Sequence, residues 1–220
     1  MKDVAIIKNS KDLDAKLKKL VDSNKPVIIV KNYITNKVCD SVIKFCHIKS
    51  KNSINQKKNK YFFYSIDVHP KGSKTDRIFR TFIFNKFTIF QFLKKLIDLQ
   101  KITVLKKVNE KNILRRVQVI HYPVGGGFFA AHKHPRYPTN YGLILNLSKR
   151  KRDFIKGSTN FYYKKKIIDL EKMKVNQGDL ILFRFDLKHF ISPIDPKEDL
   201  SFSIKGRWTL VMPIFKKTKK

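Results

Sequence analysis

The first sixty residues show a helical hydrophobic pattern, then a strand pattern, then a second helical pattern. Apolar residues within 13–21 recur at i, i+4, i+7 and i+8, which predicts a helix with one apolar face and Ser10 as its N-cap. The β-branched run at 26–30 predicts a strand. Thr35 is the expected N-cap of a second helix that reaches Cys46. We expect this region to be scaffold.

Residues 47–100 continue with a loop, two strands and a helix. The polar stretch at 47–60 is rich in Lys, Asn and Ser and predicts a loop. Alternating apolar residues at 61–69 and 77–84 predict two strands, with a turn at 70–73 between them. Apolar residues at helical spacing predict a third helix over 86–100.

Beyond residue 110 the pattern changes to short apolar runs separated by turns. The runs occupy residues 115–121, 128–134, 141–147, 159–163, 166–170, 179–185, 189–194 and 204–214. About eight short strands in roughly 100 residues are typical of a sandwich or jelly roll. We therefore predict an α+β fold, with a double-stranded β-helix (jelly-roll, cupin-like) core at 111–215 and N-terminal flanking helices and strands at 1–110.

We assign residues 1–220 to a single domain that ends in a disordered basic tail at 216–220. In residues 1–8 a charged residue interrupts the apolar run, which is too short for a signal peptide. No apolar stretch approaches the roughly 18 residues of a membrane span. The protein is therefore expected to be cytoplasmic and to bind no membrane. Cys39 and Cys46 lie too far apart along the expected helix for a disulfide, so we expect two reduced core residues.

The net charge changes this picture only in part. The chain has 49 Lys+Arg against 17 Asp+Glu, a formal net charge of +32. Such an excess is typical of nucleic-acid binding, where basic side chains neutralise phosphates. Only nine of the 49 are Arg, however, and Lys is spread along the whole chain with abundant Ile, Asn and Phe. We favour compositional bias over a nucleic-acid partner, and expect the positive field to attract an anionic substrate.

Three histidines form the candidate site for chemistry. His132 and His134 stand two apart at the end of the run 128–134, so on a strand both imidazoles point to one face. His189 opens a later apolar run, after the turn at Gly178 and Asp179. Three imidazoles suit Fe, Zn, Cu or Ni rather than Mg or Ca. The arrangement therefore predicts a transition-metal site with open coordination positions.

The segments around these histidines follow a definite order. They are VIHYPVGGGFFAAHKH at 119–134, LILNL at 143–147, VNQGDLILF at 175–183, His189, and GRW at 206–208. This order resembles the 2-oxoglutarate/Fe(II)-dependent oxygenases over about 95 residues, most specifically in the Gly-Asp turn before an apolar strand and the distal histidine. In that family an H-x-D/E pair and a later His bind Fe(II), and a basic residue further on, commonly Arg, binds the far carboxylate of 2-oxoglutarate.

The resemblance implies that His132 and His189 bind Fe(II) and that Arg207 anchors 2-oxoglutarate as co-substrate. The family's acid is replaced here by His134, which raises the net charge of the metal unit by one. Three interpretations stay open: a three-His iron site as in cupin-type dioxygenases, a two-His site with His134 turned away, or a degenerate site. Arg207 follows His189 by 18 residues, more than is usual in the family, and a loop insertion at 195–199 would account for this.

Further candidates lie on strands that flank the expected pocket. Tyr122 and Asn146 are candidate hydrogen-bonding residues for the co-substrate, and Tyr141 is a candidate for the substrate. Arg77 and Arg80 are candidate ligands for an anionic substrate. Each of these residues is also explained as an ordinary strand residue, and the two arginines as part of a solvated strand face.

Two further features are interpreted as structural. The glycines at 125–127 lack the Gly-Lys-Ser/Thr ending of a phosphate loop and no helix follows them, so they predict a hairpin turn. His69 and His121 are expected to have structural roles.

The expected function is a non-haem Fe(II) and 2-oxoglutarate-dependent oxygenase that hydroxylates an unknown small-molecule substrate with O₂. Two alternatives stay open. A three-His cupin-like dioxygenase without 2-oxoglutarate would keep the metal but would not need Arg207. A basic nucleic-acid-binding protein with a degenerate site would need surface lysines in place of the histidines.

Overall fold

The computed structural model describes residues 3–51, 62–69, 76–84, 90–105 and 108–217. The helices are α1 (Leu13–Asp22), α2 (Asn36–Lys51), α3 (Phe92–Lys101) and the 3-10 helix η2 (Glu110–Asn112). The strands are β1 (Val4–Lys8), β2 (Val27–Lys31), β3 (Phe62–His69), β4 (Arg77–Phe84), β5 (Ile113–Arg115), β6 (Val117–Val124), β7 (Gly127–His132), β8 (Tyr141–Asn146), β9 (Thr159–Tyr163), β10 (Lys166–Asp169), β11 (Leu180–Arg184), β12 (His189–Ile194), β13 (Ser201–Val211) and β14 (Ile214–Lys216).

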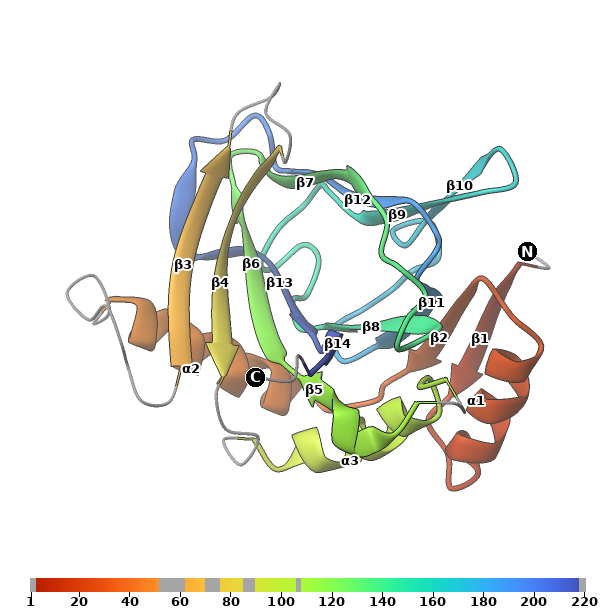
Figure 1. The fold of residues 1–220 in the computed structure, drawn as a ribbon. Coiled ribbons are helices and arrows are strands. Elements are labelled where there is room, and N and C mark those ends of the chain that lie inside the picture. Colours follow the sequence, from red (N-terminus) through yellow and green to blue (C-terminus); the bar gives the residue numbers. More distant parts are fainter. Residues whose placement is uncertain (1–2, 52–61, 70–75, 85–89, 106–107, 218–220) are drawn as a thin grey trace.

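Twelve of these strands form one sheet that curls into an open barrel (Figure 1). The strand order is β1-β2-β11-β8-β13-β6-β4-β7-β12-β9-β10, with β3 paired to β4, and β14 forms a separate two-stranded sheet with β5. One wall of the barrel contains β2, β11, β8, β13 and β6, and the facing wall contains β7, β12, β9 and β10. The helices lie outside the barrel. This is the predicted α+β double-stranded β-helix, and strands from the N-terminal flank continue its sheet.

β4 is the strand at which one wall passes into the other. Residues 80–84 of β4 pair with β6, and residues 77 and 78 pair with β7 along the same edge. β6 and β7 therefore follow one another beside β4 and do not pair as a hairpin, which corrects the prediction for 125–127. Gly125 and Gly126 do form a tight turn there, both with positive φ. A Cβ on Gly125 would lie 2.3 Å from the backbone of Asp199, so only glycine fits.

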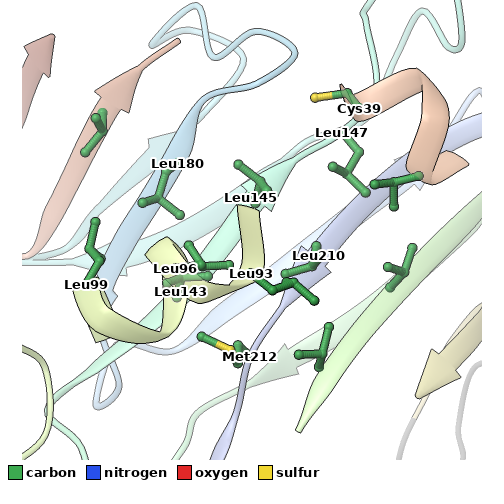
Figure 2. Close-up of a cluster of buried hydrophobic side chains, with 14 of the residues drawn as sticks. Cys39, Leu93, Leu96, Leu99, Leu143, Leu145, Leu147, Leu180, Leu210 and Met212 are labelled. Atoms are coloured by element: carbon green, nitrogen blue, oxygen red, sulfur yellow. The ribbon is translucent and has the colours of Figure 1, made fainter. Parts of the chain in front are cut away.

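The main core lies between the outer face of the first wall and the helices. Leu93, Leu96 and Leu99 recur at helical spacing on α3 and are at most 2% exposed. They face leucines of β8, β11 and β13, including Leu145 and Leu210 (Figure 2). Burying one such side chain contributes about 1.5–3 kcal/mol relative to leaving it in water. This packing fixes the wall whose inner face carries part of the site.

Several predicted element boundaries are corrected. α1 has Asp12 as its N-cap residue, and Ser10 instead donates a hydrogen bond of 2.6 Å to the Asp12 carboxylate. α2 continues to Lys51, into the expected loop, and the rest of that loop lies outside the described residues. The predicted cap of α2 is confirmed, because the Val38 amide donates to Thr35 Oγ1 at 3.4 Å.

Three strands were not predicted from the hydrophobic pattern: β1, β5 and β14. β14 changes the interpretation of the C-terminus, because Lys216, predicted to begin a tail, is its last residue and pairs with Ile113 of β5. The next backbone amide, of Lys217, donates to the Asn112 carbonyl at 2.8 Å. Residues 218–220 lie outside the described part of the chain. α3 begins at Phe92, and residues 86–89 of the predicted helix likewise lie outside the described residues.

The cysteine prediction is confirmed. Cys39 and Cys46 are free and buried on α2. Burial raises the pKa of the Cys39 thiol to about 12, so it stays protonated and behaves as a small core residue.

No helix in the described segments has the length and apolar character needed to cross a membrane.

Candidate metal centre

The barrel brings the three predicted histidines together. His132 ends β7 and is the cross-strand partner of His189, which begins β12. His134 lies two residues beyond the end of β7, where its backbone amide donates to the Phe185 carbonyl at 3.0 Å. The predicted strand therefore ends earlier than expected, yet one ligand atom from each imidazole lies within 4.8 Å of the others. In the described chain these residues form a three-His cluster that could hold a metal ion.

Backbone contacts fix which nitrogen two of these imidazoles offer. His132 Nδ1 lies 2.9 Å from the Ala130 carbonyl oxygen, and His189 Nδ1 lies 3.0 Å from the Leu187 carbonyl oxygen. Because a carbonyl can only accept a hydrogen bond, each Nδ1 carries the proton. Each Nε2 then has the free lone pair that metal binding requires.

The electrostatic environment keeps the cluster uncharged. Burial, together with the smaller effect of the neighbouring His132, lowers the pKa of His189 to about 3 and the pKa of His134 to about 4. Burial also lowers the pKa of His132. Since metals bind neutral imidazole, the three side chains are ready to act as ligands at neutral pH without losing protons.

Arg207 is a buried cation whose hydrogen bonding is incomplete. The side chain is on β13 and is 3% exposed. Its Nη2 donates to Thr159 Oγ1 at 2.7 Å, but Nη1 has no partner. Burial lowers its pKa to about 10, so the guanidinium stays charged at neutral pH. Leaving a charged donor unpaired in the interior is costly, and a carboxylate would satisfy it.

Tyr122 stands beside this arginine. The two residues are cross-strand partners in β6 and β13, and the guanidinium carbon lies 5.9 Å from the Tyr122 ring centroid. Burial raises the pKa of Tyr122 to about 12, which keeps its hydroxyl protonated and able to donate a hydrogen bond. Thr159, on β9 of the facing wall, was not predicted because nothing in its sequence context distinguishes it from other strand residues.

A cavity of about 310 Å³ joins the two features. The residues that line it include His132, His134 and His189 as well as Arg207, Tyr122 and Thr159. Most of the other lining side chains are apolar or aromatic, and none is Asp or Glu. The cavity can therefore hold a small molecule that contacts the histidine cluster at one point and the guanidinium at another.

Two other predicted site residues do not line this cavity. The Asn146 amide nitrogen donates to the carbonyls of Ser148 and Asn176, at 3.1 Å and 2.8 Å. The Tyr141 hydroxyl donates to the Lys25 carbonyl at 2.7 Å. Both side chains connect loops to the sheet.

The two predicted arginines of β4 also lie outside the lining. Arg77 Nη2 donates to the Asp67 carboxylate at 2.9 Å. Arg80 is 2% exposed, and its Nε donates to His121 Nδ1 at 2.8 Å. The His121 Nε2–H then donates to the Lys205 carbonyl at 2.7 Å, and the ring stacks on Trp208 at 4.1 Å. The expected structural role of His121 is supported by these contacts.

The Gly-Asp turn before β11 also has a structural explanation. Asp179 is fully buried and accepts hydrogen bonds from the Lys31 ammonium and from the backbone amides of Asn32 and Asn176. A Cβ on Gly178 would lie 2.2 Å from the Ile34 carbonyl oxygen, and its φ is +83°. The turn therefore holds β11 against the segment that follows β2.

The fold is similar to those of two solved enzymes. A prolyl-4-hydroxylase from Pseudomonas putida matches with a TM-score of 0.63 at 10% identity, over 93% of this chain and 100% of that chain. A prolyl hydroxylase from Trichoplax adhaerens, in complex with a hypoxia inducible factor peptide fragment, matches with a TM-score of 0.58 at 15% identity, over 93% and 89%. No family model and no curated protein matches the sequence. At these identities the likeness establishes the double-stranded β-helix fold.

Proposed function

We propose that this protein is a non-haem Fe(II) and 2-oxoglutarate-dependent oxygenase with a three-His metal site. One observation carries the proposal: the histidine cluster and a buried arginine with an unpaired nitrogen line the same cavity. A metal alone would need only the histidines. The arginine adds a binding site for a carboxylate at a second point of the cavity, which is what a 2-oxo dicarboxylate requires.

The residues present fit both groups. Three imidazoles, two with Nε2 free, suit Fe(II), and the unpaired Arg207 Nη1 suits the far carboxylate of 2-oxoglutarate. When bound, Fe(II) supplies the site where O₂ oxidises 2-oxoglutarate to succinate and CO₂, one oxygen atom going to succinate and the other into a substrate C–H bond. Without a carboxylate ligand the metal keeps its full charge, which favours a dianionic co-substrate.

The protein's own residues bind, orient and exclude water. The carbonyls of Ala130 and Leu187 hold two imidazole rings in the orientation that exposes Nε2. Thr159 accepts from Arg207 and so fixes the direction of the remaining guanidinium nitrogen. Tyr122, whose ring centroid lies 5.9 Å from the Arg207 guanidinium carbon and which lines the same cavity, supplies its hydroxyl as a second donor for the carboxylate. Apolar lining limits the water that can reach the reacting atoms.

The test is iron stoichiometry after anaerobic loading and dialysis. We expect close to one Fe(II) per chain in the wild type and none in His189→Ala, because the remaining pair cannot complete the site. His69→Ala is the matched control, since His69 is on β3 beside Asp67 and lies outside the cluster. Stoichiometric iron in His189→Ala would refute the metal site.

A three-His dioxygenase that does not use 2-oxoglutarate is the second candidate, favoured by the absence of a carboxylate from the histidine cluster in the described residues. The two candidates differ in their need for Arg207. O₂ consumption that depends on 2-oxoglutarate and is lost in Arg207→Ala supports the first. Activity toward an organic substrate that persists without 2-oxoglutarate and in Arg207→Ala supports the second.

A further inference from the structure

The cavity has a closed end and an open end. Around Arg207 the lining is buried, with Thr159 fully buried and Thr209 2% exposed. Other lining residues are open to solvent: Tyr137 is 46% exposed and Phe215 is 39% exposed. The co-substrate anchor therefore lies at the closed end. The open end, which we call the mouth, is where a substrate must bind.

The mouth has an apolar wall from two separate parts of the chain. Phe215 follows the end of β13 and Tyr137 comes from the loop before β8, and both rings are exposed. Exposed aromatic rings that line a cavity are typical of a binding site for an apolar or aromatic group. The wall thus suits an apolar part of the substrate, and the charges at the mouth indicate the polar group.

The charge at the mouth is positive. Lys216 is exposed, lines the cavity and has no carboxylate partner among the described residues. The Arg116 guanidinium carbon lies 4.8 Å from the Phe215 ring centroid, which places a second cation beside the mouth. No acidic side chain lines the cavity. With Arg207 committed to the co-substrate, Lys216 is the cation of the lining that is left for the substrate.

We propose that the substrate is a small molecule with an apolar or aromatic body and one anionic group, which Lys216 binds at the mouth of the cavity. Lys is a point charge without the planar fork of Arg, so it accepts a carboxylate, a sulfate or a phosphate. The proposal rests on the oxygenase function proposed above for the identity of the reaction, but binding at the mouth requires neither metal nor 2-oxoglutarate.

The test compares two probes of closely similar shape, the anion 4-phenylbutyrate and the neutral 4-phenylbutanamide, by ligand-observed NMR titration of the metal-free protein. We expect the anion to bind about fivefold more tightly, as a partly exposed ion pair allows. Lys216→Met should remove this preference while keeping the apolar stem. Lys217→Met is the matched control, because Lys217 is exposed and is not part of the lining. 2-Phenylethyl phosphate then distinguishes a phosphate from a carboxylate as the preferred anion.

Each other outcome overturns the proposal. Equal affinities for the anion and the amide would show that charge does not contribute to binding. No binding of either probe would show that the mouth does not bind apolar groups. Loss of the preference in Arg207→Ala rather than Lys216→Met would mean that the anion uses the co-substrate anchor. These titrations use metal-free protein, so a negative result would not affect the iron stoichiometry test. The two proposals can therefore be tested separately.

Discussion

The two faces of β13 are equally buried but differ in what surrounds them. Trp208 and Leu210, both fully buried, belong to the main core, and Trp208 Nε1 donates to the Ile204 carbonyl at 2.9 Å. Arg207 and Thr209, at 3% and 2% exposed, line the cavity, and Arg207 keeps an unpaired nitrogen. Burial alone therefore does not separate scaffold from site. The site is distinguished from the scaffold by its cavity and by a charged group whose hydrogen bonding is incomplete.

The largest effect on this contrast is expected from Arg207→Met. Removing one partner of a buried charge pair should weaken 2-oxoglutarate binding to the metal-loaded protein by about 2–5 kcal/mol, roughly 30-fold to several thousandfold. The same change should stabilise the protein without ligands by about 1–4 kcal/mol, since an unpaired buried cation is replaced by an apolar side chain. Anaerobic calorimetry and urea unfolding measure the two quantities. Unchanged affinity would contradict the assignment of the anchor.

Adjacent residues on the two faces offer a comparison of stability. Leu210→Ala should lower the free energy of unfolding by about 2–5 kcal/mol, because it creates a cavity in a close-packed core. Val211→Ala should cost only about 1 kcal/mol, because Val211 is half-buried and already borders the cavity. Urea unfolding of both variants tests this. Equal losses would show that the inner face is packed like the outer one.

The buried network beneath β13 should make stability depend on pH. His121 is fully buried, and burial holds its pKa well below the usual value of 6.5. Below pH 6.5 the unfolded chain binds a proton at this position and the folded chain does not. Stability present above pH 6.5 is thus lost as the pH falls, with a slope of up to about 1.4 kcal/mol per pH unit.

His121→Gln tests this slope, because its amide can accept from Arg80 and donate to Lys205 but does not titrate. Unfolding free energies between pH 6.5 and 5 should fall less steeply in this variant than in the wild type. An unchanged slope would show that other groups cause the acid sensitivity.

The smallest effect is expected from Tyr122→Phe. The ring still packs beside Arg207, but the hydroxyl is lost as a donor to the co-substrate. We expect 2-oxoglutarate affinity to fall by about 0.5–1.5 kcal/mol, roughly two- to tenfold, with little change in iron binding. Calorimetry on the iron-loaded variant under nitrogen measures both, and an unchanged affinity would limit Tyr122 to packing.

The sequence predicted most of the elements and the cluster of histidines, because hydrophobic period and spacing are local signals. Runs such as 159–163 and 189–194 appear as β9 and β12 with the predicted ends. It did not predict β1, β5 or β14, whose short runs become strands only by pairing with distant residues.

The same limit applies to the cavity. Thr159 and Lys216 enter its lining only because β9 lies against β12 and β14 against β5. Asn146, Tyr141, Arg77 and Arg80 had suitable chemistry, but their hydrogen bonds to nearby backbone or side-chain groups place them elsewhere. Side-chain direction at a strand end depends on such tertiary contacts, which sequence spacing does not encode.

The most direct test of the central claim is anaerobic titration of the metal-free protein with Fe(II) and then 2-oxoglutarate, followed by visible spectroscopy. Chelation of Fe(II) by a 2-oxo acid gives a weak charge-transfer band. We predict that this band appears at one equivalent of each in the wild type and is lost at the same concentrations in Arg207→Ala. Iron binding with no band in the wild type would contradict a cavity that holds metal and co-substrate together.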